Sequence, residues 1–439
     1  MAAPAGDLEL RAAVLRCLRL TFLHADLQLK RSGMSDQATA PQLTALNGVR
    51  FFAVFHIFLY HLWSTRYEAD ITKGEFSGVY AQLDSLPTWL SNFLAHGYLS
   101  TSFFFILSGF ILAFLYWTPE GTLSTSNRQF WITRFSRIYP AHIIVFVITA
   151  LLTVPRFFVD PSAPSPLVGA ASALATVTLT HAWIAPLVPI FSWPTWALSA
   201  IVFLYLIMPW LMRVLARLTR KQQLALLIAS PVISLIPTLI FLQFFPDGAA
   251  DNVNWRIFIG STPLFWVAQF VAGMLLARIF GLSRFTQGWR TQPKRWFALG
   301  DLALLALIAI ALMEPHSYPW RHILRHGLLM PLYLLVIYDF ALGRGFFARV
   351  FSLPGMNFLG QLSFSIFIWQ NLLMMVSFIV VFVNREAAPA AFWTAVLGLL
   401  CISAVSTYFI EKPIASRLRR RFARRNEQPP LITAPAKTA

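Results

Sequence analysis

The sequence predicts an all-α polytopic membrane protein, and its composition, apolar runs and charge placement support that fold class. Of the 439 residues, 57% are hydrophobic and only 12% are charged, and the mean hydropathy is +0.63. A soluble protein of this size needs a far more charged surface. Several apolar runs instead reach the roughly 20 residues that a helix needs to cross a bilayer. Disordered, fibrous and disulfide-framework proteins are therefore excluded.

Ten apolar runs are predicted to be membrane-spanning helices. They lie near residues 44–64, 98–117, 139–155, 195–216, 223–245, 258–280, 297–313, 325–342, 358–382 and 390–411. An eleventh run, at 167–188, is weaker because small and hydroxylated residues fill its middle and Pro-rich segments enclose it.

Charge placement decides the topology. The chain has 35 Lys and Arg against 18 Asp and Glu, a net charge of +17. In a soluble domain this excess suggests nucleic-acid binding, but here the basic residues cluster between apolar runs, as expected for cytoplasmic loops. Ten spans and cytoplasmic N- and C-termini place the main basic loops inside. An eleventh span would move most of them outside, so we expect 167–188 to be an outer or re-entrant segment shielded by protein or a water-filled cavity.

The chain is predicted to form one membrane domain at residues 43–415, between a leader at 1–42 and a basic cytoplasmic tail at 416–439. The leader has no long apolar core followed by a cleavage site, so it is not predicted to be a signal peptide. A start-site artefact and a surface helix both remain open for it. The two cysteines, Cys17 and Cys401, show no metal-ligand or disulfide pattern.

One basic loop breaks the charge rule. Arg321, His322, Arg325 and His326 fall on the predicted outer side. The first interpretation is an interfacial loop whose arginines meet lipid phosphates, and the second is contact with an anionic acceptor outside the cell.

The first span carries the strongest candidate pair, Arg50 and His61. Ionisable groups inside a span are costly and usually face a cavity or a partner. At about 100° and 1.5 Å per residue, their spacing places both on one helix face, about 16 Å apart. A guanidinium can hold phosphate and a neutral imidazole can accept a hydroxyl proton. The alternative is a snorkelling arginine and a packed histidine. His56 points elsewhere and is predicted to be packed or interfacial.

Two further features lie on the next segments. Arg134 and Arg137 are three residues apart in RFSRIYP, on one face if helical. They are either topology anchors or, beside Arg50, part of one cytoplasmic anion site. Ser108 and Gly109 in the second span permit close backbone approach or a kink, and small-residue helix packing is the simpler interpretation.

An ordered set of short motifs carries a family resemblance. The motifs are LNGVR followed by His61, FFFILSGF, RFSRIYP, WALSAIVFLYLIMP, FVAGMLLAR, GQLSFSIFIWQ and FIEKP. Each is weak alone, but their order and spacing resemble the acyltransferase 3 family of integral membrane acyltransferases over about residues 43–415.

The resemblance implies an enzyme that moves an acyl group, usually acetyl, from cytoplasmic acyl-CoA to a hydroxyl of a cell-surface or exported polysaccharide or glycolipid. It implies a multi-pass protein of the cell inner membrane, with membrane lipids, acyl-CoA and a glycan or lipid-linked sugar as partners, and no metal or nucleic acid. The family's motifs fall on Arg50, Arg134 and Arg137 as donor-phosphate ligands. His61 is implied to be the catalytic base or a transient acyl carrier, and we favour the base.

The family pattern also marks supporting residues and departures. The supporting residues are Ser108, Gly109, Trp196, Ser199, Tyr205, Gln370 and Glu411. Asn47 replaces an aspartate, Ile201 replaces a glutamate, and Gln370 replaces a histidine. Glu411 and Pro413 match the closing motif. The losses suggest a changed acceptor.

Two alternatives stay open at this point. A sugar or lipid transporter or flippase has the same polytopic composition, although inverted repeats and broken helices, its expected signs, are not evident. The other is a catalytically inactive relative, because Ile201 and Gln370 remove two family groups.

Overall fold

The computed structural model describes residues 43–65, 83, 85–118, 120–245, 253–286, 297–314, 319–384 and 388–424. The predicted leader and the tail beyond residue 424 lie outside the described residues. Within these ranges the predicted all-α fold is confirmed, because the regular elements are helices and the β structure is one isolated bridge between Trp117 and Leu123.

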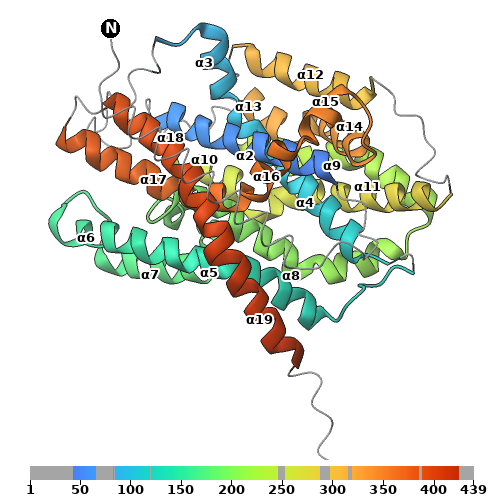
Figure 1. Ribbon diagram of the computed structural model, residues 1–439, viewed down its shortest axis with the longest axis horizontal. Helices are drawn as coiled ribbons and strands as arrows, with labels where there is room; N and C mark the ends of the chain where they lie inside the picture. Colours follow the sequence, from blue (N-terminus) through green and yellow to red (C-terminus); the bar gives the residue numbers. More distant parts are fainter. Residues whose placement is uncertain are drawn as a thin grey trace, which may run out of the picture.

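The structure divides into long helices joined by short helical turns (Figure 1). The longer helices are α2 (Thr44–Thr65), α3 (Thr88–Ala95), α4 (Ser100–Tyr116), α5 (Asn127–Thr153), α7 (Pro166–Val177), α8 (Trp196–Ala216), α9 (Arg220–Phe244), α10 (Val253–Ser261), α11 (Val267–Thr286), α12 (Leu299–Leu312), α14 (Met330–Ala341), α16 (Pro354–Gln361), α17 (Ser363–Val383), α18 (Ala388–Val405) and α19 (Lys412–Arg424). The short elements are η3 (Gly97–Leu99), α6 (Arg156–Val159), η4 (His181–Trp183), η5 (Ala185–Leu187), η6 (Trp193–Thr195), η7 (Pro263–Trp266), α13 (Trp320–Ile323), η9 (Leu324–Leu328), α15 (Phe346–Phe351) and η11 (Ser406–Glu411).

Nine helical segments in the described ranges are long and apolar enough to cross a membrane. They are Thr44–Ser64, Thr88–Tyr116, Asn127–Val159, Trp193–Ala216, Arg220–Phe244, Asn254–Gly281, Trp320–Ala341, Ser363–Val381 and Ala391–Phe422. The tenth predicted span, 297–313, differs: α12 has 14 residues and extends about 21 Å, less than the roughly 30 Å of a hydrocarbon core. This span was predicted from the hydropathy of the run, which does not show how many of its residues form a helix.

The weak segment at 167–188 has a helix that is shorter still. The helix α7 has 12 residues, about 18 Å, and a left-handed residue, Leu179 (φ 57°), follows it. Side chains of neighbouring helices satisfy carbonyl groups of this segment: Ser199 donates to the Leu179 carbonyl at 2.5 Å and Tyr139 donates to the Val177 carbonyl at 2.7 Å. Irregular backbone at membrane depth is tolerated when protein satisfies it in this way.

Local caps set the starts of two long helices. Ser126 accepts the Gln129 N–H at 3.2 Å at the start of α5. At the start of α9, Thr219 accepts the Gln222 N–H at 3.3 Å and the Gln222 side chain accepts the Thr219 N–H at 2.9 Å. Each cap satisfies backbone donors that a helix leaves unpaired, so both helices begin at a fixed residue beside a basic segment.

The helix α2 lies between two hydrophobic cores. Its residues Leu46 and Val49 belong to the core built with α4, α8, α11 and α14. Its residues Phe58 and Leu62 belong to a second core with α5, α16, α17 and α18. The helix α2 thus lies among the other helices, as Figure 1 shows. Its polar side chains therefore point into the space between those helices.

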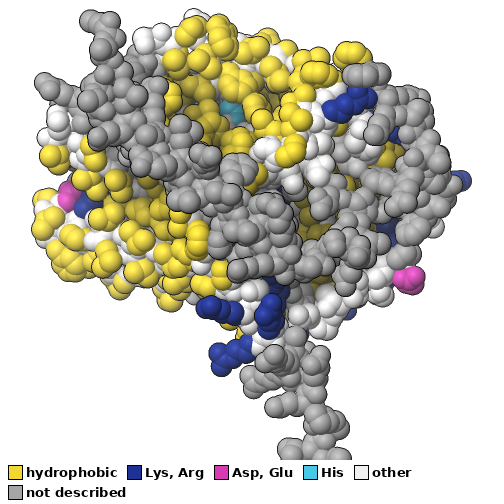
Figure 2. Space-filling view, in the orientation of Figure 1, with side chains coloured by type: hydrophobic (Ala, Val, Ile, Leu, Met, Phe, Trp, Pro, Cys, Tyr) yellow, Lys and Arg dark blue, Asp and Glu magenta, His cyan; other side chains and the backbone are white. Residues whose placement is uncertain are grey.

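The outer surface is largely apolar. Figure 2 shows hydrophobic side chains over much of the described part of this face, with Lys and Arg gathered near the place where α19 leaves the body. Exposed large side chains such as Leu151 (71%), Ile228 (70%) and Val232 (65%) suit contact with lipid rather than water.

Candidate active site

One cavity of about 810 Å³ collects the principal predicted site residues. Its lining comes from α2, α4, α5, α8, α10, α13, η9 and α17, among other segments. Arg50 and His61 on α2 and Arg134 and Arg137 on α5 all line it. The structure therefore brings the expected donor ligands and the expected base to one space inside the bundle.

Three arginines form one end of the cavity, which we call the inner end. Arg50 donates to the Gly360 carbonyl at 2.7 Å, and Arg134 donates to the Tyr116 hydroxyl at 2.6 Å. Arg137 lies close enough to both to repel them. The Nε groups of Arg50 and Arg134 are buried without a hydrogen-bond partner in the described part of the chain. Spare guanidinium donors in a cluster of like charges favour an anion such as a phosphate group.

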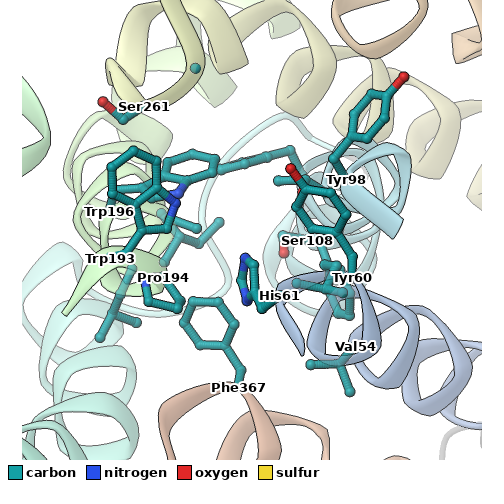
Figure 3. Close-up of a pocket in the computed structure, with 18 of the residues that line it drawn as sticks. Val54, Tyr60, His61, Tyr98, Ser108, Trp193, Pro194, Trp196, Ser261 and Phe367 are labelled. Atoms are coloured by element: carbon teal, nitrogen blue, oxygen red, sulfur yellow. The ribbon is translucent and has the colours of Figure 1, made fainter. Parts of the chain in front are cut away.

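The imidazole of His61 lies in the middle of the cavity. Figure 3 shows the ring between Phe367 and Tyr60, with Ser108 behind it. His61 Nδ1 is 3.2 Å from Gln370 Oε1, and Gln370 Nε2 donates to the Phe367 carbonyl at 3.0 Å. Because the carbonyl fixes the amide nitrogen, the amide oxygen faces the ring and Nδ1 carries the hydrogen. Nε2 then keeps a lone pair for a proton.

The loop that broke the charge rule forms the opposite end, which we call the outer end. Arg321 and Arg325 line the cavity. The Arg321 guanidinium lies 4.5 Å from the Tyr98 ring centroid and donates to the Tyr60 hydroxyl. His326 is buried outside the cavity lining, 4.9 Å from the Trp266 ring. The lipid-phosphate interpretation of these arginines is therefore wrong, since both face the interior.

Three of the expected supporting residues line the same space. Ser108 of α4, Trp196 of α8 and Tyr205 of α8 are all in its wall. The Tyr205 phenol lies within electrostatic range of the inner-end arginines, and Trp196 stacks on Trp266 at 5.5 Å. They give the cavity aromatic walls with a few polar groups, the usual character of a ligand site.

The other supporting residues, apart from Gln370, contribute to helix packing and hydrogen bonding outside the cavity. A Cβ on Gly109 would lie 2.0 Å from the Phe270 carbonyl oxygen, so this glycine allows α4 and α11 to touch. Ser199 binds the irregular segment after α7. Glu411 accepts from Ser406 at 2.8 Å. None of the three lines the cavity.

His56 is a packed histidine, as its helical position predicts. Its ring nitrogens lie 2.7 Å from the Phe93 carbonyl and 3.0 Å from the Ser100 hydroxyl, and its ring stacks on Phe93. Sequence reasoning missed Tyr60 and Trp193 as wall residues. Their proximity to His61 and Trp196 in the chain was the available signal.

Comparison with known proteins shows the family of the chain. The sequence model of the acyltransferase 3 family, described as an acyltransferase domain, matches residues 43–411. The chain belongs to the acyltransferase 3 family. That membership separates it from transporters that carry sugars or lipids without chemistry. Among the described residues, no group of three or more His, Cys, Asp or Glu side chains could hold a metal ion.

Two curated relatives are similar over part of their length. Acyltransferase MdmB of Streptomyces mycarofaciens is 28% identical over 170 residues, 38% of this chain and 38% of that protein. Peptidoglycan O-acetyltransferase OatA of Listeria monocytogenes is 23% identical over 386 residues, 84% of this chain and 55% of that protein. The chain thus spans about half the length of OatA and a smaller share of MdmB. No solved structure matches the chain significantly.

The departures from the acyltransferase 3 pattern have visible consequences. Gln370 keeps a hydrogen bond to His61 but cannot pass on a proton as a histidine can. Ile201 lines the cavity with an apolar side chain where the family has a carboxylate. Asn47 donates to the Asn357 amide oxygen at 3.0 Å, a bond that an aspartate would have to accept instead.

Proposed function

We propose that this protein is an integral membrane O-acyltransferase. It moves an acyl group, acetyl by default, from cytoplasmic acyl-CoA to a hydroxyl of a cell-surface or exported polysaccharide or glycolipid. The observation that carries the proposal is a single cavity with an arginine cluster at one end, His61 in the middle and a second arginine pair at the other end. The similarity to OatA, which is a peptidoglycan O-acetyltransferase, supports the glycan acceptor.

The inner end suits the phosphate groups of the donor. Arg134 and Arg137 lie three residues apart on α5 and line the same end of the cavity as Arg50, and together they offer several charge-assisted donors. From Arg50 the face of α2 runs about 16 Å to His61, which gives the long pantetheine arm a path to the imidazole. We place the protein in the inner membrane, with this end on the cytoplasmic side by the positive-inside rule. Cytoplasmic placement of both chain termini requires α12 to be the tenth crossing, beside the nine longer helical segments.

His61 acts as a general base in the proposed reaction. Its Nε2 takes the proton of the acceptor hydroxyl while the hydroxyl oxygen bonds to the thioester carbonyl carbon. When the tetrahedral intermediate collapses, the carbon–sulfur bond breaks and the sulfur leaves with the electron pair. The imidazolium returns its proton to that sulfur. Gln370 holds the ring in the tautomer that this sequence needs.

The test is turnover of labelled acetyl-CoA by the purified protein in lipid nanodiscs. Release of free CoA with label in an added glycan, dependent on His61, is the expected result. Binding of acetyl-CoA without turnover would point to an inactive relative, and movement of glycan across the membrane without CoA release would point to a transporter.

A further inference from the structure

We propose that the outer end of the cavity binds an oxyanion carried by the acceptor, so that the acceptor is an acidic sugar bearing a carboxylate or a phosphate. This inference rests on the proposed acyl transfer and adds the class of substrate to it. Neither the family nor the names of the relatives assigns this role.

Arg325 is held by aromatic faces. Its guanidinium carbon lies 4.9 Å from the Trp266 ring centroid and 5.3 Å from the Trp196 ring centroid. Its Nε is buried without a hydrogen-bond partner among the described residues. A guanidinium stacked on aromatic rings keeps its planar edge available, and that edge matches a carboxylate or phosphate in a bidentate contact.

The backbone of Arg325 is also fixed. Its carbonyl accepts from the Ser102 hydroxyl of α4 and from the Gln269 amide of α11 at 3.2 Å. It lies in the π-helical turn η9, and π turns frequently occur at functional sites. A residue anchored on two neighbouring helices presents its side chain in a set direction, as a binding site requires.

The charges of the lining are unbalanced. The described residues that line the cavity include no aspartate or glutamate. Its six arginines are Arg50, Arg134, Arg137, Arg256, Arg321 and Arg325. Cations buried at membrane depth are costly without a counter-charge. The donor phosphates can neutralise the first three. Arg256 is exposed, but Arg321 and Arg325 are enclosed by aromatic rings at the outer end and need a different anion.

The walls beside this arginine pair are aromatic. Tyr60 and Tyr98 flank Arg321, and Trp193 and Trp196 line the space opposite His61 (Figure 3). Flat rings with polar edges offer one face to the apolar side of a sugar ring and leave its hydroxyls free. His61 lies within electrostatic range of Arg325, so a sugar whose anion binds Arg325 can direct a hydroxyl to the imidazole.

The experiment uses three matched sugars with the purified full-length protein in nanodiscs. Saturation-transfer NMR detects weak binding of methyl glucuronoside, glucose 6-phosphate and the neutral methyl glucoside. Acetyl-CoA affinity is measured in parallel by calorimetry. The variants are Arg325→Gln, Arg325→Lys and Arg321→Gln. Arg156→Gln removes a charge from an exposed arginine that pairs with Asp160 outside the cavity, and is the matched control. Thermal unfolding checks that each variant is folded.

We expect one or both anionic sugars to bind roughly ten- to hundredfold better than the glucoside, which is the range of a charge-assisted hydrogen bond. Arg325→Gln should remove the preference for the anionic sugars, and Arg325→Lys should keep part of it. The control Arg156→Gln should keep the full preference. The affinity for acetyl-CoA should be the same in all these variants. The relative signals of glucuronoside and phosphate tell carboxylate from phosphate.

Three outcomes overturn the inference: equal binding of all three sugars, no binding of either anion, or loss of acetyl-CoA affinity in folded Arg325→Gln. The last would mean that the outer arginines hold the donor. Anion preference without any acyl turnover would leave the binding site standing and reject the proposed function, so the two failures are distinguishable.

Discussion

A tyrosine hydroxyl accepts from one arginine at each end of the cavity, from Arg134 at the inner end and from Arg321 at the outer end. The two ends hold Arg50 and Arg325 in different ways. At the inner end, hydrogen bonds to a carbonyl and a phenol fix Arg50 and Arg134. At the outer end, indole rings hold Arg325 by its face. The first arrangement suits several phosphate oxygens of one extended donor. The second leaves a planar edge for one oxyanion beside aromatic walls that fit a sugar. In the proposed function, the donor therefore takes the inner end and the acceptor takes the outer end.

His61 lies between the two ends and is the proposed base, so its replacement has the largest expected effect on acyl transfer. We predict that His61→Ala lowers the turnover number for acetyl transfer by about 10² to 10⁴, the usual contribution of a general base. The melting temperature and acetyl-CoA affinity should stay near those of the wild type. Transfer at the normal rate by a folded His61→Ala protein would refute the base role.

The inner arginines should affect the donor alone. Replacing Arg134 and Arg137 together by Ala is expected to weaken acetyl-CoA binding roughly tenfold or more, because two charge-assisted contacts to phosphate are lost. The residual salt dependence should be smaller than that of the wild type. Calorimetry at two salt concentrations measures both effects, with Arg156→Gln as the control. Unchanged affinity returns both arginines to the role of topology anchors.

Gln370 should change catalysis without changing binding. We expect Gln370→Leu to lower the turnover number about tenfold, because His61 loses the acceptor that sets its tautomer, a loss of about 1 kcal/mol or more. The KM values should be nearly constant. Gln370→His, which restores an acceptor and the usual family residue, should recover much of the rate. Equal rates for Gln370→Leu and the wild type would exclude a positioning role.

The local part of this site was predictable from the sequence, and the distant part was not. Helical periodicity alone puts Arg50 and His61 on one face, because both belong to one helix. The bond between His61 and Gln370 joins residues 309 positions apart. The stacking of Arg325 on Trp196 and Trp266 likewise joins three separate elements. Such contacts depend on tertiary packing, about which a single sequence carries no periodic signal.

The fold shows the same limit. Apolar runs predicted the helices, but the run at 297–313 gives a helix of only 14 residues. The segment at 167–188 was predicted not to cross from charge parity, and its short helix agrees. The side chains that satisfy its backbone, Ser199 among them, come from other helices and were not predictable as its partners.

The last substitution tests helix packing and not the proposed chemistry. Gly109→Ala should destabilise the protein by about 1–3 kcal/mol, because the new Cβ would meet the Phe270 carbonyl at 2.0 Å and push α4 from α11. Gly355→Ala is the matched control, since nothing lies within 4 Å of its Cβ position. Thermal unfolding compares the two. Equal melting temperatures would mean that α4 and α11 are not tightly packed at this crossing.

The central claim is that one cavity opens to the donor on the cytoplasmic side and to the acceptor on the outer side. Sealed membrane vesicles carrying Arg134→Cys or Arg325→Cys, each with Cys17→Ser and Cys401→Ser, can be treated with a membrane-impermeant thiol reagent from either face. We expect Arg134→Cys to react from the cytoplasmic face only, with protection by acetyl-CoA, and Arg325→Cys to react from the outer face only. Reaction of both positions from the same face would contradict the account.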